Sequence, residues 1–330
     1  MKIGIVGAGM AGLACADALK HQDHDVTLFD KGRGPGGRIS TRRVETPLGE
    51  ASFDHGAQYF TARDPAFRRL VADWADRGLA ARWQPAGAEA WVGVPGMNAI
   101  VKTMADGHRA HGSSLVQGLA RLDHGWQLLG DGLSTDAFDA IIVAVPAEQA
   151  ATLLGSHDLG LARHALMARS QPCWTAMFVL DAPLDTQRLV LRDQGVIGWA
   201  ARNSAKPGRT GPETWVVQAN GGWSSDAIEA SPAWVEEQLL AALADALGIA
   251  IPVPIASLSH RWRYALSAGI GGGPLWNPEL RLGVCGDWLV GPRIESAWLS
   301  GRALARAVGE KPETVMLEFF HAIEQGEADA

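Results

Sequence analysis

Residues 1–30 read MKIGIVGAGMAGLACADALKHQDHDVTLFD, and this stretch decides the fold class of the chain. An apolar run is followed by a turn with three glycines, an alanine-rich segment and a second apolar run, the order of a strand, a turn, a helix and a strand. Gly7 permits the tight turn, Gly9 lets the backbone approach a pyrophosphate, and Gly12 lets the helix pack close to the strand. The spacing therefore predicts a βαβ unit of the dinucleotide-binding type.

The start of the helix and the acid at the end of the second strand complete this prediction. Met10 and Ala11 open the helix, so their unpaired N–H groups can receive the negative charge of a phosphate. Asp30 ends the second strand, where a carboxylate accepts hydrogen bonds from an adenosine ribose and repels a 2′-phosphate. These features in register predict a bound dinucleotide. The alternative is a glycine-rich turn that binds nothing.

Length and composition set the class of protein. A chain of 330 residues suggests about two domains. With 47% hydrophobic and 20% charged residues, it has the composition of a globular protein and no apolar run near the ~20 residues that a membrane span needs. A net charge of −7 argues against nucleic acid or an anionic membrane as partner. Cleavage at Ala14–Ala16 would destroy the glycine turn, so we expect no secretory signal and a cytoplasmic location.

The cysteines offer no chemistry of their own. Cys15, Cys173 and Cys285 are far apart and odd in number, which excludes a disulfide framework and a CxxC metal pattern. Each lies among apolar neighbours, so we expect small buried side chains. We predict no metal site.

A second glycine-rich stretch, KGRGPGGRIST at residues 31–41, follows Asp30 directly. So many glycines predict a loop whose backbone passes close to another group. Arg33 and Arg38 add cations beside the expected pyrophosphate, and a guanidinium matches phosphate oxygens geometrically. The alternative is a solvated basic loop.

With this loop, the chain resembles the FAD-binding half of the amine-oxidase-like flavoproteins, in which a second glycine-rich stretch completes the cofactor cradle. A nicotinamide dehydrogenase would not need this second stretch, so the resemblance implies non-covalent FAD. It implies FAD contacts at Gly7, Gly9, Met10, Ala11, Gly12, Asp30, Lys31, Gly37 and Arg38.

The stretch ASFDHGAQYFT at residues 51–61 resembles the LGAQYIT-type segment of renalases, with His55 in place of the leucine. In such proteins this segment lies beside the flavin ring and lines the substrate cavity. The resemblance therefore implies cofactor contacts at His55, Gly56 and Ala57. It implies substrate contacts at Gln58, Tyr59, Phe60 and Thr61. His55 is either a catalytic base or a structural residue that the backbone satisfies.

Four further stretches match in order. Gly96 stands in the Pro-Gly turn before the next helix, near the cavity, and Leu119 stands where these flavoproteins lay backbone groups along the adenine edge. Residues 138–146 form a buried parallel strand that matches the family's D-x-x-Ile/Val-x-Ala-x-Pro marker. The last stretch implies contacts of Asp287 with the ribityl or phosphate region and, through the backbone, of Ile294 and Glu295 with the flavin.

The region from about residue 165 to 262 differs in character. Strands are expected at 174–180, 195–200 and 214–219, and a helix from Ser231 to about Leu247, which together suggest a second domain on an antiparallel sheet. Residues 260–264 resemble the K/R-W-R segment of renalases, so Trp262 and Arg263 are its cavity candidates, with an interdomain hinge as the alternative. Glycine-rich residues 268–274 are expected to be a loop. Earlier in the chain, residues 113–127 are expected to form a small antiparallel meander and residues 147–154 a helix. Asp64 and Pro65 are expected to cap and start a helix that runs to about Arg77.

We therefore predict an α/β protein of the p-hydroxybenzoate hydroxylase/amine-oxidase-like class. A Rossmann-type two-dinucleotide-binding FAD domain comprises residues 1–62, 97–164 and 265–330. An α+β substrate domain built on an antiparallel sheet comprises residues 63–96 and 165–264.

The resemblance to renalases implies the reaction. Renalases oxidise the 2- and 6-dihydro isomers of NAD(P)H to NAD(P)+, passing a hydride to flavin N5 and the electrons to O2, which yields H2O2. A dihydropyridine regains aromaticity by hydride loss alone, so positioning suffices and we predict no catalytic side chain. The preferred isomer, the choice between NAD and NADP, and the oligomeric state stay open.

Two other functions are considered. The first is a FAD-dependent amine oxidase, which in this fold commonly has an aromatic pair over the flavin and a lysine near N5. This chain has Gly291, Pro292 and Arg293 where the aromatic residue is expected. Its few lysines fit such a site badly: Lys2, Lys20, Lys31, Lys102, Lys206 and Lys311. The second is a non-catalytic FAD-binding redox sensor.

Overall fold

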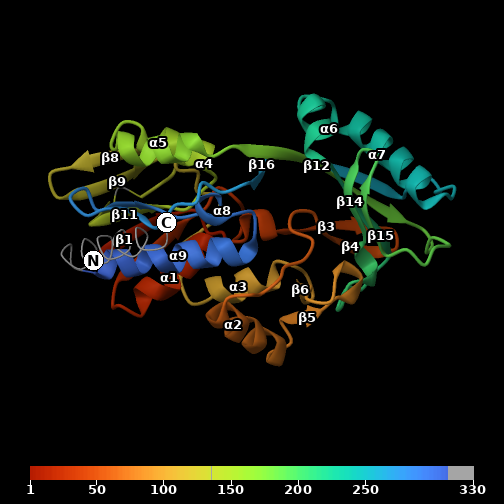
Figure 1. The fold of residues 1–330 in the computed structure, drawn as a ribbon, viewed down its shortest axis with the longest axis horizontal. Helices are drawn as coiled ribbons and strands as arrows, with labels where there is room; N and C mark the ends of the chain where they lie inside the picture. The colour runs from red at the N-terminus through yellow and green to blue at the C-terminus, as the bar shows by residue number, and fades with distance from the viewer. Residues whose placement is uncertain (135, 311–330) are drawn as a thin grey trace, which may run out of the picture.

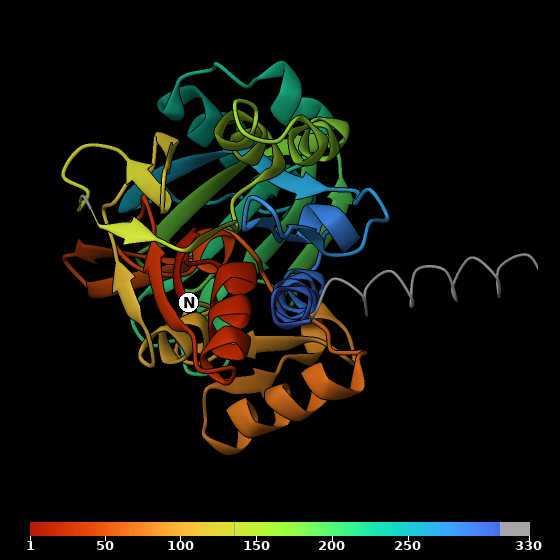
Figure 2. The same cartoon turned by 90° about the vertical axis from the view of Figure 1, so that its left-hand side faces the viewer.

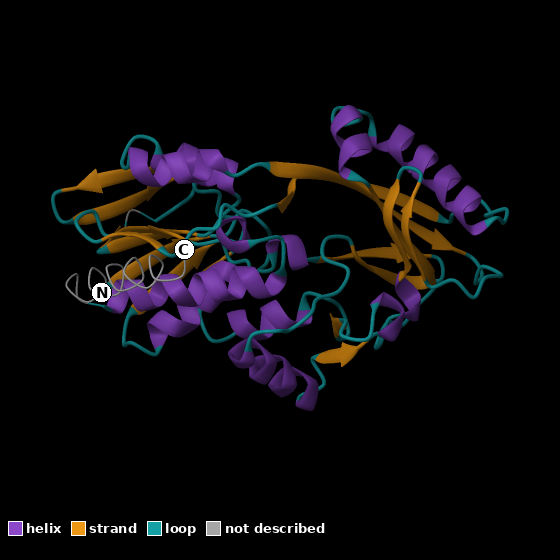
Figure 3. Ribbon diagram, viewed as in Figure 1, coloured by secondary structure: helices purple, strands orange, loops and turns teal. Residues whose placement is uncertain are grey.

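The computed structural model describes residues 1–134 and 136–310. Residue 135 and the last 20 residues of the expected FAD domain, which include Lys311, lie outside this range. Figure 1 shows two sheets toward opposite ends of the molecule, joined by the long strands β12 (Ser170–Leu180) and β16 (Ala256–Ser267). Figure 3 shows that helices cover both sheets.

The six-stranded sheet begins with the βαβ unit that the first 30 residues predict. Its strand order is β17 (Leu275–Asn277), β18 (Leu282–Val284), β11 (Ala140–Val143), β1 (Lys2–Val6), β2 (Asp25–Phe29) and β7 (Arg109–His111). All neighbours are parallel except β17 and β18. The strand predicted at 138–146 is present over a shorter range as β11, which is buried between β1 and β18, whereas Phe138 belongs to β10.

Two helices cover one face of this sheet side by side, α1 (Met10–Lys20) and α9 (Ile294–Gly309), as Figures 1 and 2 show. A Cβ at Gly301 of α9 would overlap the carbonyl oxygen of Ala11, so the two backbones are in direct contact. The N-terminal unit and the C-terminal helix therefore form one layer, although nearly the whole chain separates them.

The opposite side carries the small antiparallel sheet β8 (Gly118–Leu122), β9 (Gly125–Leu129) and β10 (Ala137–Phe138), which confirms the expected meander. The helices α4 (Ala147–Leu154) and α5 (Leu159–Met167) lie beside it. The predicted bounds of α4 are confirmed.

The five-stranded antiparallel sheet has the order β13 (Val190–Gln194), β14 (Ile197–Arg202), β15 (Glu213–Ala219), β12 and β16. On one face lie α6 (Gly221–Asp226) and α7 (Pro232–Leu247), and Leu239 of α7 packs on Phe178 and Trp215. The other face packs against the hairpin β3 (Thr41–Thr46) and β4 (Gly49–Asp54) through Phe53. The hairpin therefore connects the two sheets.

The remaining elements are mostly short. They are α2 (Pro65–Asp76), β5 (Ala80–Arg82), β6 (Trp91–Gly93), α3 (Ala99–Ala105), α8 (Asp287–Val290) and the 3-10 helices Gly37–Ile39, Gln84–Ala86 and Asn203–Ala205. The predicted cap Asp64 is confirmed, because its carboxylate accepts from the N–H groups of Ala66 and Phe67. Residues 268–274 hold no helix or strand, as predicted.

Several strands were not predicted, among them the hairpin β3–β4 and the short strands β5, β7 and β17. Strand β13 has no clear alternation, and the 260–264 cluster belongs to one strand of 12 residues, β16. Among the described residues, none of the helices has the length and apolar character needed to cross a bilayer.

Candidate functional site

The first glycine turn has no room for a side chain at Gly7 and Gly12, whereas it is open at Gly9. Gly7 has φ +108°, and a Cβ there would overlap the carbonyl oxygen of Ala144. A Cβ at Gly12 would overlap the carbonyl oxygen of Gly7. At Gly9, in contrast, a Cβ would find no atom within 4 Å. The turn therefore has an open side where the sequence places a pyrophosphate.

The second glycine stretch folds back onto the first. The N–H of Gly36 donates to the carbonyl oxygen of Ala8 (3.0 Å), and a Cβ at Gly37 would lie 3.8 Å from Cα of Gly9. Gly36 and Gly37 have φ +135° and +52°, values that favour glycine. We call Gly7, Gly9, Gly12, Gly36 and Gly37 the glycine cradle.

Asp30 joins the two stretches of the glycine cradle. Its Oδ2 accepts from the N–H of Ala8 (2.8 Å) and its Oδ1 from the N–H of Gly32 (2.7 Å), while Lys31 beside it is exposed. The N–H of Ser114 donates to the carbonyl oxygen of Asp30 (2.8 Å). Residues 113 and 114 therefore border the acid, a position that the sequence did not reveal.

Leu119 lies further along, in strand β8. Its side chain is buried in the apolar core of the meander, and its carbonyl oxygen accepts from Nε2 of His157 (3.0 Å). A carbonyl oxygen has two lone pairs, so this bond leaves the expected role of Leu119 at an adenine edge as a prediction.

Arg38 brings the second glycine stretch together with the C-terminal part of the chain. Its guanidinium lies 2.5 Å from Oδ1 of Asp287, the buried first residue of α8, and donates to the carbonyl oxygen of Ala265 (3.0 Å). The two residues come from opposite ends of the chain, as the resemblance implied. Their ion pair places a cation and a buried carboxylate next to the cradle.

The N-terminus of α9 offers unpaired groups. Ile294 is its first residue, and the side chain of Glu295 accepts from the N–H groups of Arg63 and Asp64 (both 2.6 Å). Glu295 is therefore directed toward the start of α2, so that only its backbone is available to a cofactor. Ser296 is fully buried and its Oγ has no hydrogen-bond partner among the described residues. Sequence reasoning missed Ser296.

Residues 55–57 are held from both sides. The Nε1–H of Trp262 donates to the carbonyl oxygen of His55 (2.9 Å), and Nε2 of Gln218 donates to that of Gly56 (2.8 Å). On the other side the N–H of Ala57 donates to the carbonyl oxygen of Arg38 (2.8 Å). The segment thus lies between the five-stranded sheet and the glycine-rich loop.

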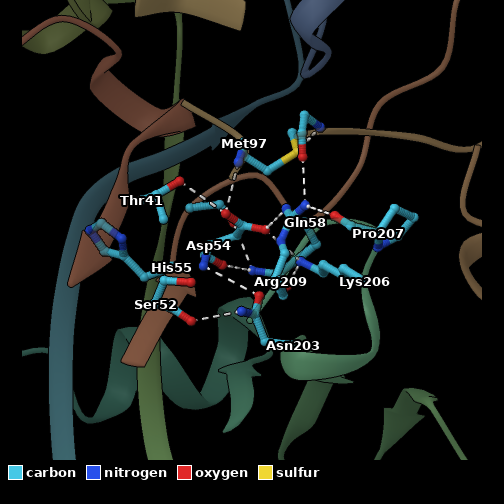
Figure 4. Close-up of polar contacts among 12 residues, drawn as sticks. Thr41, Ser52, Asp54, His55, Gln58, Met97, Asn203, Lys206, Pro207 and Arg209 are labelled. Atoms are coloured by element: carbon cyan, nitrogen blue, oxygen red, sulfur yellow. Dashed lines mark hydrogen bonds and ion pairs between the residues drawn. The ribbon is translucent and has the colours of Figure 1, made fainter. Parts of the chain in front are cut away.

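A charge cluster, defined here as Asp54, Lys206 and Arg209, lies directly before this segment (Figure 4). Nζ of Lys206 lies 3.2 Å from Oδ2 of Asp54, to which Arg209 also donates. Oδ1 of Asp54 accepts from Oγ1 of Thr41 and from the N–H of Met97 (both 2.9 Å). The three charged side chains are 0–2% exposed.

The charges of the cluster set the protonation of its members. Burial alone would raise the pKa of Asp54, but Lys206, Arg209 and the hydrogen bond from Met97 outweigh it and lower this pKa to about 2. Burial lowers the pKa of Lys206 to about 8; Asp54 opposes this shift and Arg209 adds to it. Asp54 is therefore ionised throughout the physiological range, whereas Lys206 can lose its proton just above it.

Gln58 belongs to the same network. Its Nε2 donates to the carbonyl oxygens of Asp54 and Gly56, and its Oε1 accepts from Nζ of Lys206 (3.1 Å). The sequence indicated that the lysines fit an amine-oxidase site badly, yet Lys206 contacts Gln58, one of the predicted substrate residues. A single lysine on a loop gives no sequence signal of this contact, because Lys206 lies 148 positions from Gln58.

His55 is buried and surrounded by other rings. Its ring stacks on Trp262 at 5.1 Å between centroids and meets His260 edge-on at 5.1 Å. Burial, followed by His260 and Arg42, lowers the pKa of His55 to about 4, and its Nδ1 has no partner among the described residues. His55 is therefore neutral at pH 7.

The other predicted substrate residues lie in three different surroundings. The ring of Tyr59 packs at a tilt against Trp199 (5.1 Å), whose buried Nε1 has no partner among the described residues, and Thr61 is half-buried. Gly96 lies against Thr41, within the surroundings of the charge cluster. Phe60 is 4% exposed and packs into the apolar core with Phe67 and Trp74.

Arg263 stands apart from this group. Neighbouring strand residues point to opposite faces, so Trp262 faces His55 whereas Arg263 pairs with Glu229 (2.8 Å) at the surface. The sequence grouped the two residues because they are adjacent in the chain. The structure brings only Trp262 to the 55–58 segment.

Comparisons with known families match most of the chain. A model of NAD(P)-binding Rossmann-like domains matches residues 5–74, and a model of the flavin containing amine oxidoreductases matches residues 81–309. Together they support the predicted fold class.

Two solved structures share the fold at low sequence identity. A candidate protoporphyrinogen oxidase from Exiguobacterium sp. 255-15 has a TM-score of 0.74 at 10% identity. Cyclohexylamine oxidase from Brevibacterium oxydans IH-35A has a TM-score of 0.64 at 14% identity. Each comparison covers 93% of this chain and 98% of the other.

Curated relatives match over a short segment. The zeta-carotene-forming phytoene desaturase of Myxococcus xanthus is 50% identical over 44 residues, which is 13% of this chain and 8% of the relative. The 4,4′-diapophytoene desaturase of Staphylococcus aureus is 48% identical over 40 residues, again 8% of its length.

Proposed function

Because the chain belongs to the flavin containing amine oxidoreductase family, it is a FAD-dependent oxidoreductase, and we propose that it oxidises dihydronicotinamides. The proposed donors are the 2- and 6-dihydro isomers of NAD(P)H, the product is NAD(P)+, and O2 is the final acceptor. The non-catalytic sensor is set aside, because the family is one of oxidoreductases.

The residues present fit FAD. The open side of Gly9 leaves room for a pyrophosphate, and Asp30 lies at the end of β2 for a ribose. The buried Oγ of Ser296 has no partner within residues 1–134 and 136–310. Arg38 and Asp287 would hold the ribityl or phosphate region between the two glycine-rich parts. Bound FAD supplies the hydride acceptor.

One observation carries the proposal: the 55–58 segment presents no strong base. His55 is buried, and its pKa of about 4 makes the neutral ring a weak proton acceptor, while Nζ of Lys206 is bonded to Asp54 and Gln58. A donor that must lose a proton as well as a hydride would find only a weak acceptor there. A dihydropyridine becomes aromatic by losing hydride alone, so orientation is sufficient.

Tyr59 and Trp199 supply such orientation. The two rings pack at a tilt with centroids 5.1 Å apart, and Arg192 lies over both, 4.7 Å from the ring centroid of Trp199. The unpartnered indole N–H can donate to a carboxamide oxygen, and the ring faces suit a flat heterocycle. We assign this group to nicotinamide binding in the proposed reaction.

A second candidate, amine oxidation, is favoured by one observation. Amine oxidases of this fold commonly have a lysine near the flavin, and Lys206 lies next to Gln58. Against it, Nζ of Lys206 is fully enclosed and already donates to two partners.

The test is anaerobic mixing of the yellow protein with each dihydronicotinamide isomer, with ordinary NADH and with a panel of amines. We expect fast bleaching of the flavin absorbance by an isomer and slow bleaching by NADH and amines, followed by peroxide release when air is admitted. Fast bleaching by an amine alone would replace the proposal with amine oxidation.

Two variants sharpen this test. Tyr59→Ala should slow bleaching by the isomer, because the aromatic ring is lost. Trp234→Ala is the matched control, since this half-exposed aromatic stacks on Trp223 at the far end of the second sheet and should leave bleaching unchanged.

A further inference from the structure

The charge cluster connects three separate parts of the molecule behind the 55–58 segment. Asp54 ends strand β4, Lys206 and Arg209 come from the loop after β14, and Met97 precedes helix α3. Arg209 also donates to the carbonyl oxygens of Gly93 (2.6 Å) and Pro207 (2.7 Å). Figure 4 shows these partners converging on one carboxylate. The 55–58 segment therefore begins next to a carboxylate that contacts from these separate parts of the chain hold in place.

The charges in this cluster do not cancel. One carboxylate faces two cations, and all three side chains are 0–2% exposed. The other titratable groups nearby do not supply the missing negative charge: His55 is neutral, and Glu213 is paired with Arg202 at 2.8 Å. A net positive charge is thus enclosed by protein, where its effect on a neighbouring group is screened far less than at a surface.

Lys206 connects this charge to the segment. Its ammonium group donates to Oδ2 of Asp54 at 3.2 Å and to Oε1 of Gln58 at 3.1 Å, one residue on each side of the stretch 55–57. It lies over the ring of Trp83 at 5.5 Å, which adds a favourable cation–π contact.

We propose that Lys206 is a positioning residue for the cofactor, which holds residues 55–57 against the flavin and, with Arg209, provides a buried positive charge that favours the reduced flavin. This inference rests on the placing of residues 55–57 at the flavin in the proposed function. It concerns the cofactor itself and holds whatever the electron donor is.

The protonation of Lys206 makes the inference specific. Burial first, opposed by Asp54 and supported by Arg209, lowers its pKa to about 8. Asp54, with a pKa of about 2, and Arg209 keep their charges through this range. The cluster therefore carries one net positive charge below about pH 8 and none well above it, and the preference for reduced flavin should fall across that pH.

The experiment measures the midpoint potential of the FAD-loaded protein, without substrate, for the wild type and for Lys206→Met from pH 6 to pH 10. We expect the substitution to weaken the preference for reduced over oxidised flavin about tenfold, which is about 30 mV for a two-electron couple. We expect the wild type, but not the variant, to show an additional change of slope near pH 8.

Two further variants separate charge from position. Lys102→Met removes an exposed lysine on α3 and should leave the potential unchanged. Gln58→Met breaks the contact to Lys206 and keeps the charge, so it should weaken FAD binding while the potential stays near the wild-type value.

An unchanged potential in a yellow Lys206→Met protein, with the slope change retained, would overturn the inference. If that variant does not fold, the wild-type titration decides alone, and a potential with no slope change near pH 8 overturns it. Because no donor is present, a protein that passes this test and fails to oxidise dihydronicotinamides would disprove the proposed function only.

Discussion

The glycine cradle and the charge cluster are built by opposite means. The cradle works through missing side chains: any Cβ at Gly7 or Gly12 would overlap a backbone oxygen. The cluster works through long charged side chains that are 0–2% exposed. The glycine cradle offers backbone groups and space to a ligand. The charge cluster holds a backbone segment through its buried charged side chains.

The difference teaches which kind of change each region tolerates. In the glycine cradle, added side-chain volume destabilises the protein where protein atoms occupy the space above the glycine. Where that space is open, the added volume blocks the ligand instead. In the cluster, volume matters less than charge balance, because a buried ion that loses its partner is expensive. Each of the following predictions acts on one side of this contrast.

The largest effect is expected from Gly12→Val. The new side chain overlaps the carbonyl oxygen of Gly7, which no rotamer change can relieve, so we expect a loss of about 5 kcal/mol or more and no folded yellow protein. Soluble yield, circular dichroism and flavin absorbance measure it. Gly34→Ala, where no atom lies within 4 Å of the new Cβ, is the control. A folded, yellow Gly12→Val protein would refute the tight contact.

Asp54→Asn should be next. It leaves Lys206 and Arg209 buried without a carboxylate, which costs about 3–5 kcal/mol in unfolding free energy. Urea unfolding measures it. Asp73→Asn, in an exposed pair with Arg77, is the matched control and should change stability little. Equal effects of the two substitutions would mean that the cluster is not the buried network described above.

Gly9→Val tests the open side of the cradle. A Cβ at this position meets no protein atom, so the apoprotein should unfold at the same urea concentration as the wild type. The side chain would occupy the space meant for the pyrophosphate, and FAD should bind about 100-fold more weakly, about 2.7 kcal/mol. Titration of the apoprotein with FAD measures this. Unchanged affinity would place the cofactor elsewhere.

Acid should weaken the cluster in a defined range. The pKa of Asp54 is lowered in the folded protein to about 2, below its usual 3.8, so the unfolded chain binds more protons between these values. The stabilisation, about 2 kcal/mol, is complete above pH 4 and is lost as the pH falls through 2. Urea unfolding at several pH values measures it, and Asp54→Asn should lack this component.

The smallest effect is expected at Arg263. It pairs with Glu229 at the surface and faces away from His55, so Arg263→Ala should leave the KM for the dihydronicotinamide isomer unchanged. Trp262→Phe removes the indole N–H that donates to the carbonyl oxygen of His55 and should lower the free energy of unfolding by about 1 kcal/mol. A raised KM in Arg263→Ala would restore the sequence-based grouping of the two residues.

Much of the fold was predictable because its signals are local. The spacing of Gly7, Gly9 and Gly12 predicted the βαβ unit, and Asp64 before Pro65 predicted the start of α2. The helix from Pro232 to Leu247 was predicted from Ser231 before it and Gly248 after it, and both caps are present. Such patterns depend on residues within a few positions of one another, where backbone preference and capping decide the outcome.

The site was predictable only in part. The glycine-rich composition of residues 31–41 singled out Gly37 and Arg38 as candidates. The family resemblance predicted that these residues approach the first glycine turn and the C-terminal part of the chain, where they meet Gly9 and Asp287. The unpartnered Oγ of Ser296 and the placement of Lys206 carry no local signal. Nothing within a few residues of Lys206 distinguishes it from a solvated surface lysine.

The sequence by itself determined the dinucleotide-binding unit, the order of most helices and strands, and the flavoprotein character of the chain. Backbone chemistry in glycine turns is local, so its spacing can be recognised without coordinates. Only the tertiary structure decided that Asp54, Lys206 and Arg209 share one buried site and that Trp262 and Arg263 point to opposite faces of β16. The physical reason is that burial and charge pairing are properties of the packed chain, set by which distant segments meet.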